Sequence, residues 1–480
     1  MKRRLRRHPL LGAIDGARAA LIDDERSLSF DDLGQRSALV AAKLMRAGLD
    51  KGERVALVVR SSIDAVVVLV ACMRRGLVVV PINPGYQEQE LAHVLDDSGA
   101  ALVIEDDGPS LALRAVLGDR RHLTTALLCS GADAQSDDVD VDVDDDDLAL
   151  LIYTSGTTGR SKGCAHSAGG LARGLGALME LWGVDDDDVI VHALPLFHVH
   201  GLCVALIGAL LRGATTRLVR HFSPGHIVDA ISAGGTVFMS VPTMVHRLLT
   251  HLDAHPDDGA VLGRLRLLTC GSAALSAQHL VAFREKTGVT ILERYGMSET
   301  LITLSNPLHG ERKPGSVGAA VPGTSLRVID DELRVKTPGI MRGYWQREDA
   351  DREAFDDEGW FKTGDVVAVD DGGAVRIVGR SSQDILKVGG YKIATREIEE
   401  QLEAHPAVLE VAVVGEPDVE WGQRVVAVVV LRAGFSLSLP EVQAQVRLHE
   451  SKKPRRLVVV DGLPRTALGK VQKSLVKTLI

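Results

Sequence analysis

The chain has 480 residues, of which 45% are hydrophobic and 25% charged, and its formal net charge is −9. This length exceeds one ordinary hydrophobic core, so we expect two or three packed units. The negative charge argues against a protein whose main task is to hold a nucleic-acid backbone, and five scattered cysteines without a CxxC pair argue against a zinc site or a disulfide framework.

The N-terminal segment MKRRLRRHPLLGAIDGARAALIDD is basic and lacks the apolar core of a signal peptide. We expect a solvated arm there. A mitochondrial-type presequence stays open as an alternative, because the arginines precede any acidic residue. No apolar stretch reaches about 18 uninterrupted residues, so the sequence predicts no membrane span. Together with the unpaired cysteines, this pattern favours a cytoplasmic protein.

Helix-like and strand-like segments alternate through the first 130 residues. Ser29 and Asp32 form a capping-box pattern ahead of a helical apolar pattern. Strands are predicted at RVALVV (54–59), LVVVPINP (77–84) and ALVIED (101–106), and helices at SIDAVVVLVACMRRG (62–76) and QELAHVLDDSGA (89–100). This alternation is typical of a parallel sheet covered by helices, so we expect an α/β fold.

Two acidic stretches interrupt this pattern. The run SDDVDVDVDDDD at 136–147 is predicted to be a solvated linker rather than a metal site. The cluster from Asp185 to Asp188 is predicted to be an exposed turn.

The run YTSGTTGRSKG at 153–163 combines little side-chain bulk with many hydrogen-bond donors. The apolar segment before it favours a central strand, and SAGGLARGLGALMEL (167–181) after it favours a helix. A glycine-rich loop between a strand and a helix aims backbone N–H groups at phosphate. It is not a Walker loop, because Gly163 rather than Ser or Thr follows Lys162. Taken alone, the run leaves a flexible surface loop open as an alternative.

Three further stretches follow in order: ERYGMSET (293–300), GWFKTGDV (359–366) and PRTALGKVQK (464–473). Together with the loop, they resemble the adenylate-forming superfamily of acyl-CoA synthetases, luciferases and peptide-synthetase adenylation domains, over nearly the whole chain. The resemblance implies a large ATP- and acyl-binding domain of helix-covered, mostly parallel sheets (1–379). It also implies a small mobile α+β C-terminal domain (380–480), which agrees with the strand-rich texture after residue 380.

The resemblance also implies a reaction and a set of roles. Such enzymes join a carboxylate to AMP with release of diphosphate, and a thiol then displaces AMP. Lys162 would help to neutralise phosphates, Glu299 would bind Mg²⁺, Tyr295 would stack on adenine, and Asp365 would accept from ribose hydroxyls. The nucleotide-binding set is Thr154, Ser155, Gly156, Thr157, Thr158, Gly159, Lys162, Gly271, Ser272, Ala273, Tyr295, Gly296, Thr300, Asp365 and Arg380.

The C-terminal motifs are implied to act on the other substrates. Lys470 would be catalytic, with Glu299 and Lys162, because its ammonium would offset charge between the attacking carboxylate and the α-phosphate. A solvated lysine on a tail is the alternative for Lys470. Gly389 and Gly390 would face the pantetheine arm of coenzyme A. A hinge is expected in GRSSQD, at Ser382 or Gln383. The segment VRLHESKKPRR (446–456) looks shorter than its counterparts in the family.

The acyl pocket is predicted from Arg294, His198 and His200. An arginine at its end would pair with a second carboxylate and would penalise a purely apolar acid. ERYGMSETLITLSNP and GRSSQDILKVGGYKI look most like the malonyl-CoA and methylmalonyl-CoA synthetase branch, so we expect a small dicarboxylic acid. The alternatives are an Arg294 satisfied by Glu293 or another acid, and histidines satisfied within the core.

These features predict an ATP-dependent carboxylic acid–CoA ligase acting on malonate or methylmalonate, with ATP, Mg²⁺ and coenzyme A as cofactor and co-substrates. The alternatives are a medium- or long-chain fatty acyl-CoA synthetase, and an adenylating enzyme that loads the thiol of a carrier protein. A non-catalytic nucleotide-binding module is disfavoured, because Lys162, Glu299, Asp365 and Lys470 are all present. The sequence predicts no nucleic-acid partner and leaves the oligomeric state open.

Overall fold

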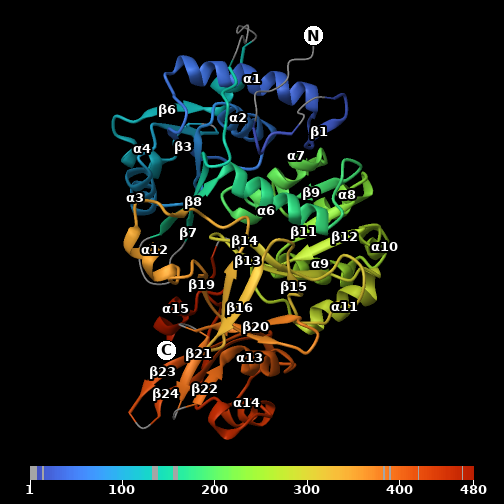
Figure 1. Cartoon of the computed structure of the whole chain (residues 1–480). Coiled ribbons are helices and arrows are strands. Elements are labelled where there is room, and N and C mark those ends of the chain that lie inside the picture. Colours follow the sequence, from blue (N-terminus) through green and yellow to red (C-terminus); the bar gives the residue numbers. More distant parts are fainter. Residues whose placement is uncertain are drawn as a thin grey trace.

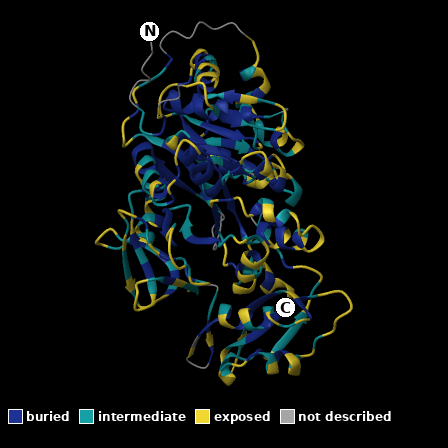
Figure 2. Cartoon of the chain, turned by 90° about the vertical axis from the view of Figure 1, so that its right-hand side faces the viewer, coloured by how far each residue is buried: buried dark blue, intermediate teal, exposed yellow. Residues whose placement is uncertain are grey.

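The computed structural model describes residues 8–12, 16–106, 108–131, 139–154, 161–381, 384–388, 391–419, 421–466 and 469–480. Two large sheets with their helices form the N-terminal part, and three smaller sheets follow toward the C-terminus (Figure 1). Buried residues are concentrated in the large N-terminal part (Figure 2).

The first large sheet has seven strands in the order β18-β8-β7-β4-β3-β5-β6. Its strands are β3 (Arg54–Val58), β4 (Val78–Pro81), β5 (Leu102–Glu105), β6 (Arg121–Thr124), β7 (Leu148–Thr154), β8 (Lys162–Ser167) and β18 (Gly343–Tyr344). The five strands from β7 to β6 run parallel, whereas β8 and β18 pair antiparallel at one edge. The helices of this region are α1 (Phe30–Arg46), α2 (Ile63–Arg74), α3 (Glu88–Ser98), α4 (Leu111–Leu117) and α5 (Thr125–Cys129).

The second large sheet has nine strands in the order β15-β14-β13-β12-β11-β9-β10-β1-β2. Its strands are β1 (Ala19–Ile22), β2 (Ser27–Ser29), β9 (Val189–His192), β10 (Thr215–Leu218), β11 (Val237–Ser240), β12 (Leu267–Cys270), β13 (Leu292–Met297), β14 (Leu301–Ser305) and β15 (Ala319–Ala320). Parallel pairing from β1 to β13 aligns the carboxyl ends of these strands at one edge, where ligands bind in open α/β sheets.

Helices connect the strands of the second sheet. They are α6 (Ala168–Leu181), the π-helical segment η1 (His200–Ile207), α7 (Gly208–Arg212), α8 (Pro224–Ser232), α9 (Pro242–Ala254), α10 (Asp258–Leu262) and α11 (Ala277–Thr287). None of the helices in the described ranges combines the length and the apolar character that crossing a bilayer requires.

Three small sheets complete the chain. The first contains β16 (Ser325–Ile329), β17 (Glu332–Lys336), β19 (Phe361–Val369) and β20 (Val375–Arg380), with α12 (Glu348–Ala354) nearby. The last two contain β21 (Ile385–Val388), β22 (Tyr391–Ala394), β23 (Val408–Asp418), β24 (Gly422–Leu431) and β25 (Arg456–Val459), with α13 (Thr395–Glu403), α14 (Leu439–Gln445), the 3₁₀ turns η2 (Glu450–Lys452) and η3 (Lys477–Leu479), and α15 (Lys473–Val476).

The expected alternation of strands and helices in the first 130 residues is confirmed. The capping box at α1 is present, since the Ser29 side chain accepts from the Asp32 backbone N–H and the Asp32 carboxylate accepts from the Ser29 backbone N–H. The two large mixed sheets and the small C-terminal α+β part also agree with the predicted fold class. Arg380 is the last residue of β20, so the expected domain boundary at 379/380 falls at the end of that strand.

The acidic run was predicted to be a solvated linker, and for its described part, 139–147, this prediction is wrong. Val139 and Val143 are each only 4% exposed, and Asp140 accepts two hydrogen bonds from the Arg74 guanidinium on α2. The valines alternate with aspartates, so apolar side chains can point to the core while the acids face outward or find a cation.

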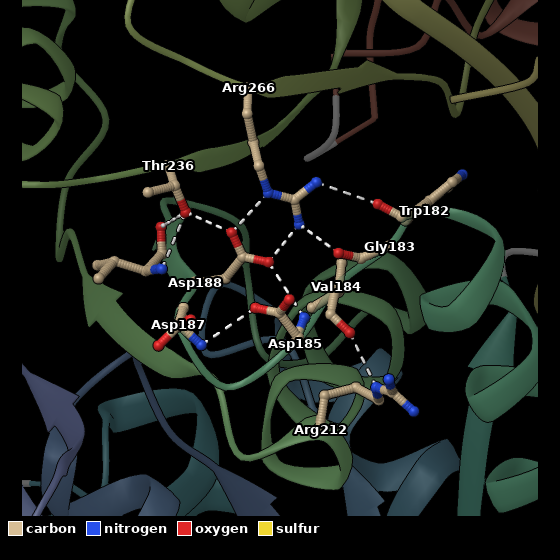
Figure 3. A network of polar contacts seen from close by, with 10 residues as sticks. Trp182, Gly183, Val184, Asp185, Asp187, Asp188, Arg212, Thr236 and Arg266 are labelled. Atoms are coloured by element: carbon tan, nitrogen blue, oxygen red, sulfur yellow. Dashed lines mark hydrogen bonds and ion pairs between the residues drawn. The ribbon is translucent and has the colours of Figure 1, made fainter. Parts of the chain in front are cut away.

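The expected exposed turn at Asp185–Asp188 is correct for its first three residues and wrong for Asp188. Asp188 is 3% exposed and accepts from the guanidinium of Arg266 and from the hydroxyl of Thr236 (Figure 3). Arg266 also donates to the carbonyls of Trp182 and Gly183. This buried network fastens the amino ends of β9, β11 and β12 to the end of α6.

Candidate active site

The glycine-rich run is the turn of a hairpin. Strand β7 ends at Thr154, β8 begins at Lys162, and these two residues pair in the antiparallel register. The predicted direct passage from loop to helix is therefore wrong, because Lys162–Ser167 form a buried strand before α6 begins at Ala168. The helix N-terminus consequently does not lie at the run. The predicted residues Ser155, Gly156, Thr157, Thr158 and Gly159 lie outside the described residues.

A small polar cluster lies at the start of β8. The Lys162 ammonium lies 4.9 Å from the centroid of the Tyr344 ring, and the Tyr344 hydroxyl donates to Glu299 Oε1 over 2.9 Å. Burial, followed by the charge of Glu299, raises the pKa of Tyr344, so its phenol keeps its proton. The cluster thus brings together two predicted residues, Lys162 and Glu299, and adds one that the sequence did not single out.

Thr300, beside Glu299, is 1% exposed, and its hydroxyl donates to the Leu301 carbonyl over 3.3 Å. The Thr300 hydroxyl is therefore buried and already hydrogen-bonded, so it is not free to contact a nucleotide as predicted. Gly296 lies on β13 against β14, where a Cβ atom would stand 2.0 Å from the Leu301 carbonyl oxygen. Glycine at this position allows the tight pairing that follows the bulge between Tyr295 and Gly296.

A second cluster joins β13 to the small sheet of β19 and β20. The Tyr295 hydroxyl donates to Asp365 Oδ2, and Arg380 Nε donates to Asp365 Oδ1 over 3.1 Å. Burial opposes the charged form of Arg380, but the nearby Asp365, Tyr295 and Glu299 outweigh it and raise the pKa of the guanidinium. Three predicted nucleotide-binding residues from distant motifs therefore meet in one place.

The segment after β12 forms the neighbouring wall. Ser272 has a φ of 71°, an uncommon conformation for a residue with a side chain, and Ala273 is exposed. Gly271 lies directly against Arg294, because a Cβ atom on Gly271 would stand 2.7 Å from the Arg294 Cζ and Nη1 atoms. Only glycine leaves room for the guanidinium at this point.

Lys470 lies at the end of a tight turn that reaches the large N-terminal part. The Lys470 backbone N–H donates to Thr466 Oγ1 over 3.2 Å, and a Cβ atom on Gly469 would stand 2.7 Å from Thr243 Cγ2 at the start of α9. Lys470 is exposed to solvent. Desolvation by the surrounding protein lowers its pKa, the positive charges of Arg380 and Lys473 lower it further, and Asp365 and Asp384 oppose this. These interactions place the lysine beside the Tyr295–Asp365–Arg380 cluster.

The predicted acyl-pocket residues form a buried basic cluster. Arg294 is 4% exposed and His200 is 2% exposed. Within the described part of the chain, Arg294 Nε and Nη2, both ring nitrogens of His200, and His198 Nε2 have no hydrogen-bond partner. Burial lowers the pKa of Arg294 to about 10, and burial together with the charge of Arg294 lowers the pKa of His200.

Glu293, the alternative partner considered for Arg294, does not pair with it. Neighbours on a strand point to opposite faces, and Glu293 Oε2 instead accepts from the Gly315 backbone N–H over 3.1 Å. Burial raises the pKa of Glu293 to about 7. No ion pair to Arg294 occurs among the described residues. A buried guanidinium with unpaired donors is costly, so the cluster is suited to receive an anion.

His192 belongs to this cluster and was missed by the sequence analysis. Its Nε2 atom lies 2.9 Å from the Gly201 carbonyl oxygen, at the start of the π-helical segment η1. A Cβ atom on Gly201 would stand 2.2 Å from the Pro195 carbonyl oxygen, so the chain folds tightly here and carries His200 inward. His192 could have been identified in the sequence as a polar residue at the carboxyl end of a predicted buried strand.

A cavity of about 310 Å³ is lined by residues that lead to His198, although Arg294, His198 and His200 are not among its lining residues. It lies at the carboxyl ends of β3, β4, β9 and β10, and the segment 193–197 that leads to His198 forms one wall. Arg60 and Arg220 lie at its lining and are exposed. The predicted residues Gly389 and Gly390, and the two hinge residues Ser382 and Gln383, lie outside the described residues.

Comparison with known proteins identifies relatives that match almost the whole chain. Malonate–CoA ligase, mitochondrial, of Homo sapiens is 35% identical over 514 residues, which cover 95% of this chain and 89% of that protein. The crystal structure of ATP-bound MatB from Rhodopseudomonas palustris is 35% identical, with a TM-score of 0.91 over 97% of this chain and 96% of that one.

A malonyl-CoA ligase ternary product complex with methylmalonyl-CoA and AMP bound is 38% identical, with a TM-score of 0.71 over 95% of this chain and 100% of that one. The family model described as AMP-binding enzyme matches residues 13–345, and the model described as AMP-binding enzyme C-terminal domain matches residues 397–470. The chain therefore belongs to the AMP-binding enzyme family.

Proposed function

We propose that this protein is an AMP-forming acid–thiol ligase that converts malonate, ATP and coenzyme A to malonyl-CoA, AMP and diphosphate. Relatives named as malonate–CoA ligases match almost the whole chain, at 33–36% identity for the vertebrate proteins. Methylmalonate is the second candidate acid, because methylmalonyl-CoA is bound in a solved relative.

The observation that carries the choice of acid is the unpaired cation of Arg294. A bound malonate would present one carboxylate to the nucleotide and a second to Arg294 and His200, whose donors have no partner in the described chain. A fatty acid would leave these donors buried and unsatisfied. This argues for a small dicarboxylate over a medium- or long-chain acid.

In the first half-reaction, a carboxylate oxygen of malonate attacks the α-phosphorus of ATP, the bond to the β-phosphate oxygen breaks, and diphosphate leaves. Lys470 would offset the negative charge that grows between carboxylate and α-phosphate. Asp365 and Arg380 would hold the ribose side of the nucleotide, and Tyr295 would bound the adenine. Lys162 would neutralise the outer phosphates. The adenylate forms without a covalent enzyme intermediate, so catalysis depends on position and charge.

Glu299 is suited to bind Mg²⁺. One of its oxygens accepts from Tyr344, and the other has no hydrogen-bond partner among the described residues. Carboxylate oxygen is a ligand that Mg²⁺ prefers, so Glu299 would hold the ion, and the ion would supply positive charge that offsets the phosphates. Tyr344 would orient the Glu299 carboxylate for that contact.

In the second half-reaction, the thiol sulfur of coenzyme A attacks the acyl carbon, the bond to AMP breaks, and the thiol proton passes to solvent. A change of orientation of the last hundred residues is proposed to serve this step. The TM-score is 0.91 to ATP-bound MatB but only 0.71 to a product complex of higher sequence identity. This contrast is what two domain orientations in the family would produce, with this structure in the nucleotide-binding one.

A substrate panel tests the proposal. The purified full chain is assayed for AMP release with ATP, Mg²⁺, coenzyme A and either malonate, methylmalonate, propionate or octanoate. Propionate carries a methyl group in place of the second carboxylate, so malonate is expected to exceed it in kcat/KM by about 100-fold or more. A preference for octanoate would contradict the dicarboxylate assignment. Replacing coenzyme A by a phosphopantetheinyl carrier protein separates the CoA ligase from a carrier-loading enzyme. A cytoplasmic location stays a prediction, and fractionation tests it.

A further inference from the structure

Lys473, three residues after Lys470, contacts two carboxylates and one hydroxyl. Its ammonium lies 2.6 Å from Asp384 Oδ1, 2.7 Å from Glu399 Oε1 and 2.6 Å from Thr395 Oγ1. The Lys473 side chain is 12% exposed and that of Glu399 is 7% exposed. Burial alone would lower the pKa of Lys473, but the two carboxylates outweigh it and raise the pKa.

The two carboxylates are themselves anchored to backbone. Asp384 Oδ2 accepts from the Arg380 backbone N–H over 2.9 Å, and Glu399 Oε1 accepts from the Val413 backbone N–H over 2.8 Å. Lys473 therefore ties the C-terminal segment to Asp384, just ahead of β21, and to α13, and through Glu399 it is linked to β23.

Asp384 also acts on Lys470. The charged groups that influence the Lys470 ammonium are Arg380, Asp365, Asp384 and Lys473. Asp384 is thus a carboxylate within electrostatic reach of two lysines, one of which it already contacts directly. A lysine that forms a close ion pair with Asp384 loses the freedom to follow a developing charge on a substrate.

We propose that Lys473 is a positioning residue for Lys470: by occupying Asp384 and Glu399, it fixes the turn that carries Lys470 and keeps Asp384 from capturing the Lys470 ammonium. The inference rests on the proposed function for the role of Lys470. Lys473 touches no substrate in this scheme. Its removal should therefore impair adenylation and spare the transfer of a preformed adenylate to coenzyme A.

Half-reactions test this assignment in the full chain. Lys473→Met is expected to slow diphosphate release with malonate about 100-fold, the effect of a misplaced catalytic group, and to leave thioester formation from synthetic malonyl-AMP within about threefold. Lys473→Arg keeps the charge and should restore much of the loss. Lys477→Met, which removes an exposed lysine of the same segment, is the control and should change neither rate. Equal losses in both half-reactions of Lys473→Met would overturn the proposal and indicate a purely structural role.

Removing the competing carboxylate gives a second test. The double variant Lys473→Met with Asp384→Asn should recover adenylation about tenfold over Lys473→Met alone, because Asp384 can no longer hold Lys470. Failure to recover, with an unfolding midpoint at or above that of the single variant, would overturn the capture mechanism.

A substrate-free measurement separates this inference from the proposed function. Acetic anhydride labelling of Lys470, followed by mass spectrometry across a pH series, reports its titration midpoint in the purified chain. Lys473→Met should move that midpoint upward, since a neighbouring positive charge is lost and a carboxylate is freed. An unchanged midpoint would overturn the inference even for an enzyme that uses another acid. If the wild-type chain is inactive on malonate but Lys473→Met still shifts the Lys470 midpoint, only the proposed acid is refuted.

Discussion

Replacing Arg294 by methionine should stabilise the free protein while it removes activity on malonate. Burial lowers the pKa of Arg294 from 12.5 to about 10. A shift of this size corresponds to about 3 kcal/mol of cost for holding the charged form in the folded chain. Methionine fills a similar volume without charge, so Arg294→Met should raise the free energy of unfolding by up to about 3 kcal/mol in the absence of substrate.

The same substitution should lower kcat/KM for malonate. With Arg294 removed, the distal carboxylate of malonate enters a buried site without its cation. Loss of one partner of a buried charge pair costs about 3–5 kcal/mol, or about 200- to 5,000-fold in kcat/KM. Propionate makes no such pair, so its kcat/KM should stay within about fivefold or rise. The assay is diphosphate release with each acid, together with thermal unfolding of the protein without ligands.

Arg266 supplies the matched control. It is an arginine of the same sheet, but its guanidinium is paired with the buried Asp188 at the opposite end of the strands (Figure 3). Arg266→Met should destabilise the protein by about 3 kcal/mol, because Asp188 is left without its cation, and should not change the ratio of malonate to propionate activity. An Arg294→Met protein that keeps malonate activity within fivefold, or that unfolds more easily than wild type, would refute the reasoning.

Three further predictions concern charge. Lys470→Ala should reduce diphosphate release by about 1,000-fold or more while calorimetry still detects ATP binding; full diphosphate release by this variant would remove Lys470 from the mechanism. Because the pKa of Lys470 is lowered, the wild-type adenylation rate should decline as the pH rises, starting at a lower pH than for an ordinary lysine. Lys470→Arg should lack this alkaline limb. For Glu293, the folded pKa of about 7 exceeds the unfolded value of 4.5, so its contribution to stability is full below pH 4.5 and is lost as pH rises through 7. Glu293→Gln should therefore raise the unfolding midpoint at pH 8, by up to about 3 kcal/mol in free energy, and leave it nearly unchanged at pH 4.5; equal effects at both pH values would contradict the buried-acid interpretation.

Local patterns predicted most of the fold. Continuous apolar runs such as the one at Val78–Pro81 are buried on both faces and became parallel strands, and the Ser29 capping box marks the start of a helix. The hairpin of β7 and β8 was missed because Lys162–Ser167 lacks the β-branched residues that signal a strand. Its pairing with β7 and β18 stabilises it, and the β18 partner lies far away in the sequence.

The site was predictable where a residue belongs to a dense motif, and not where it acts through a distant neighbour. Arg294 was singled out beside Tyr295, and the structure brings it to His200 and leaves both without partners. Tyr344 meets Glu299 across 45 residues of sequence, and no local pattern marks it. Asp188 was misread for the same reason, since Arg266 lies 78 residues further along the chain.

Strand β13 divides the two chemical faces of the site between two consecutive residues. Arg294 points toward Gly271, whereas Tyr295, one position later, points toward Asp365. Because side chains alternate, the acid preference of this enzyme can be redesigned at one position without disturbing the adenosine side. A deletion or insertion of a single residue in this strand would do the reverse, exchanging the two faces and abolishing both specificities at once.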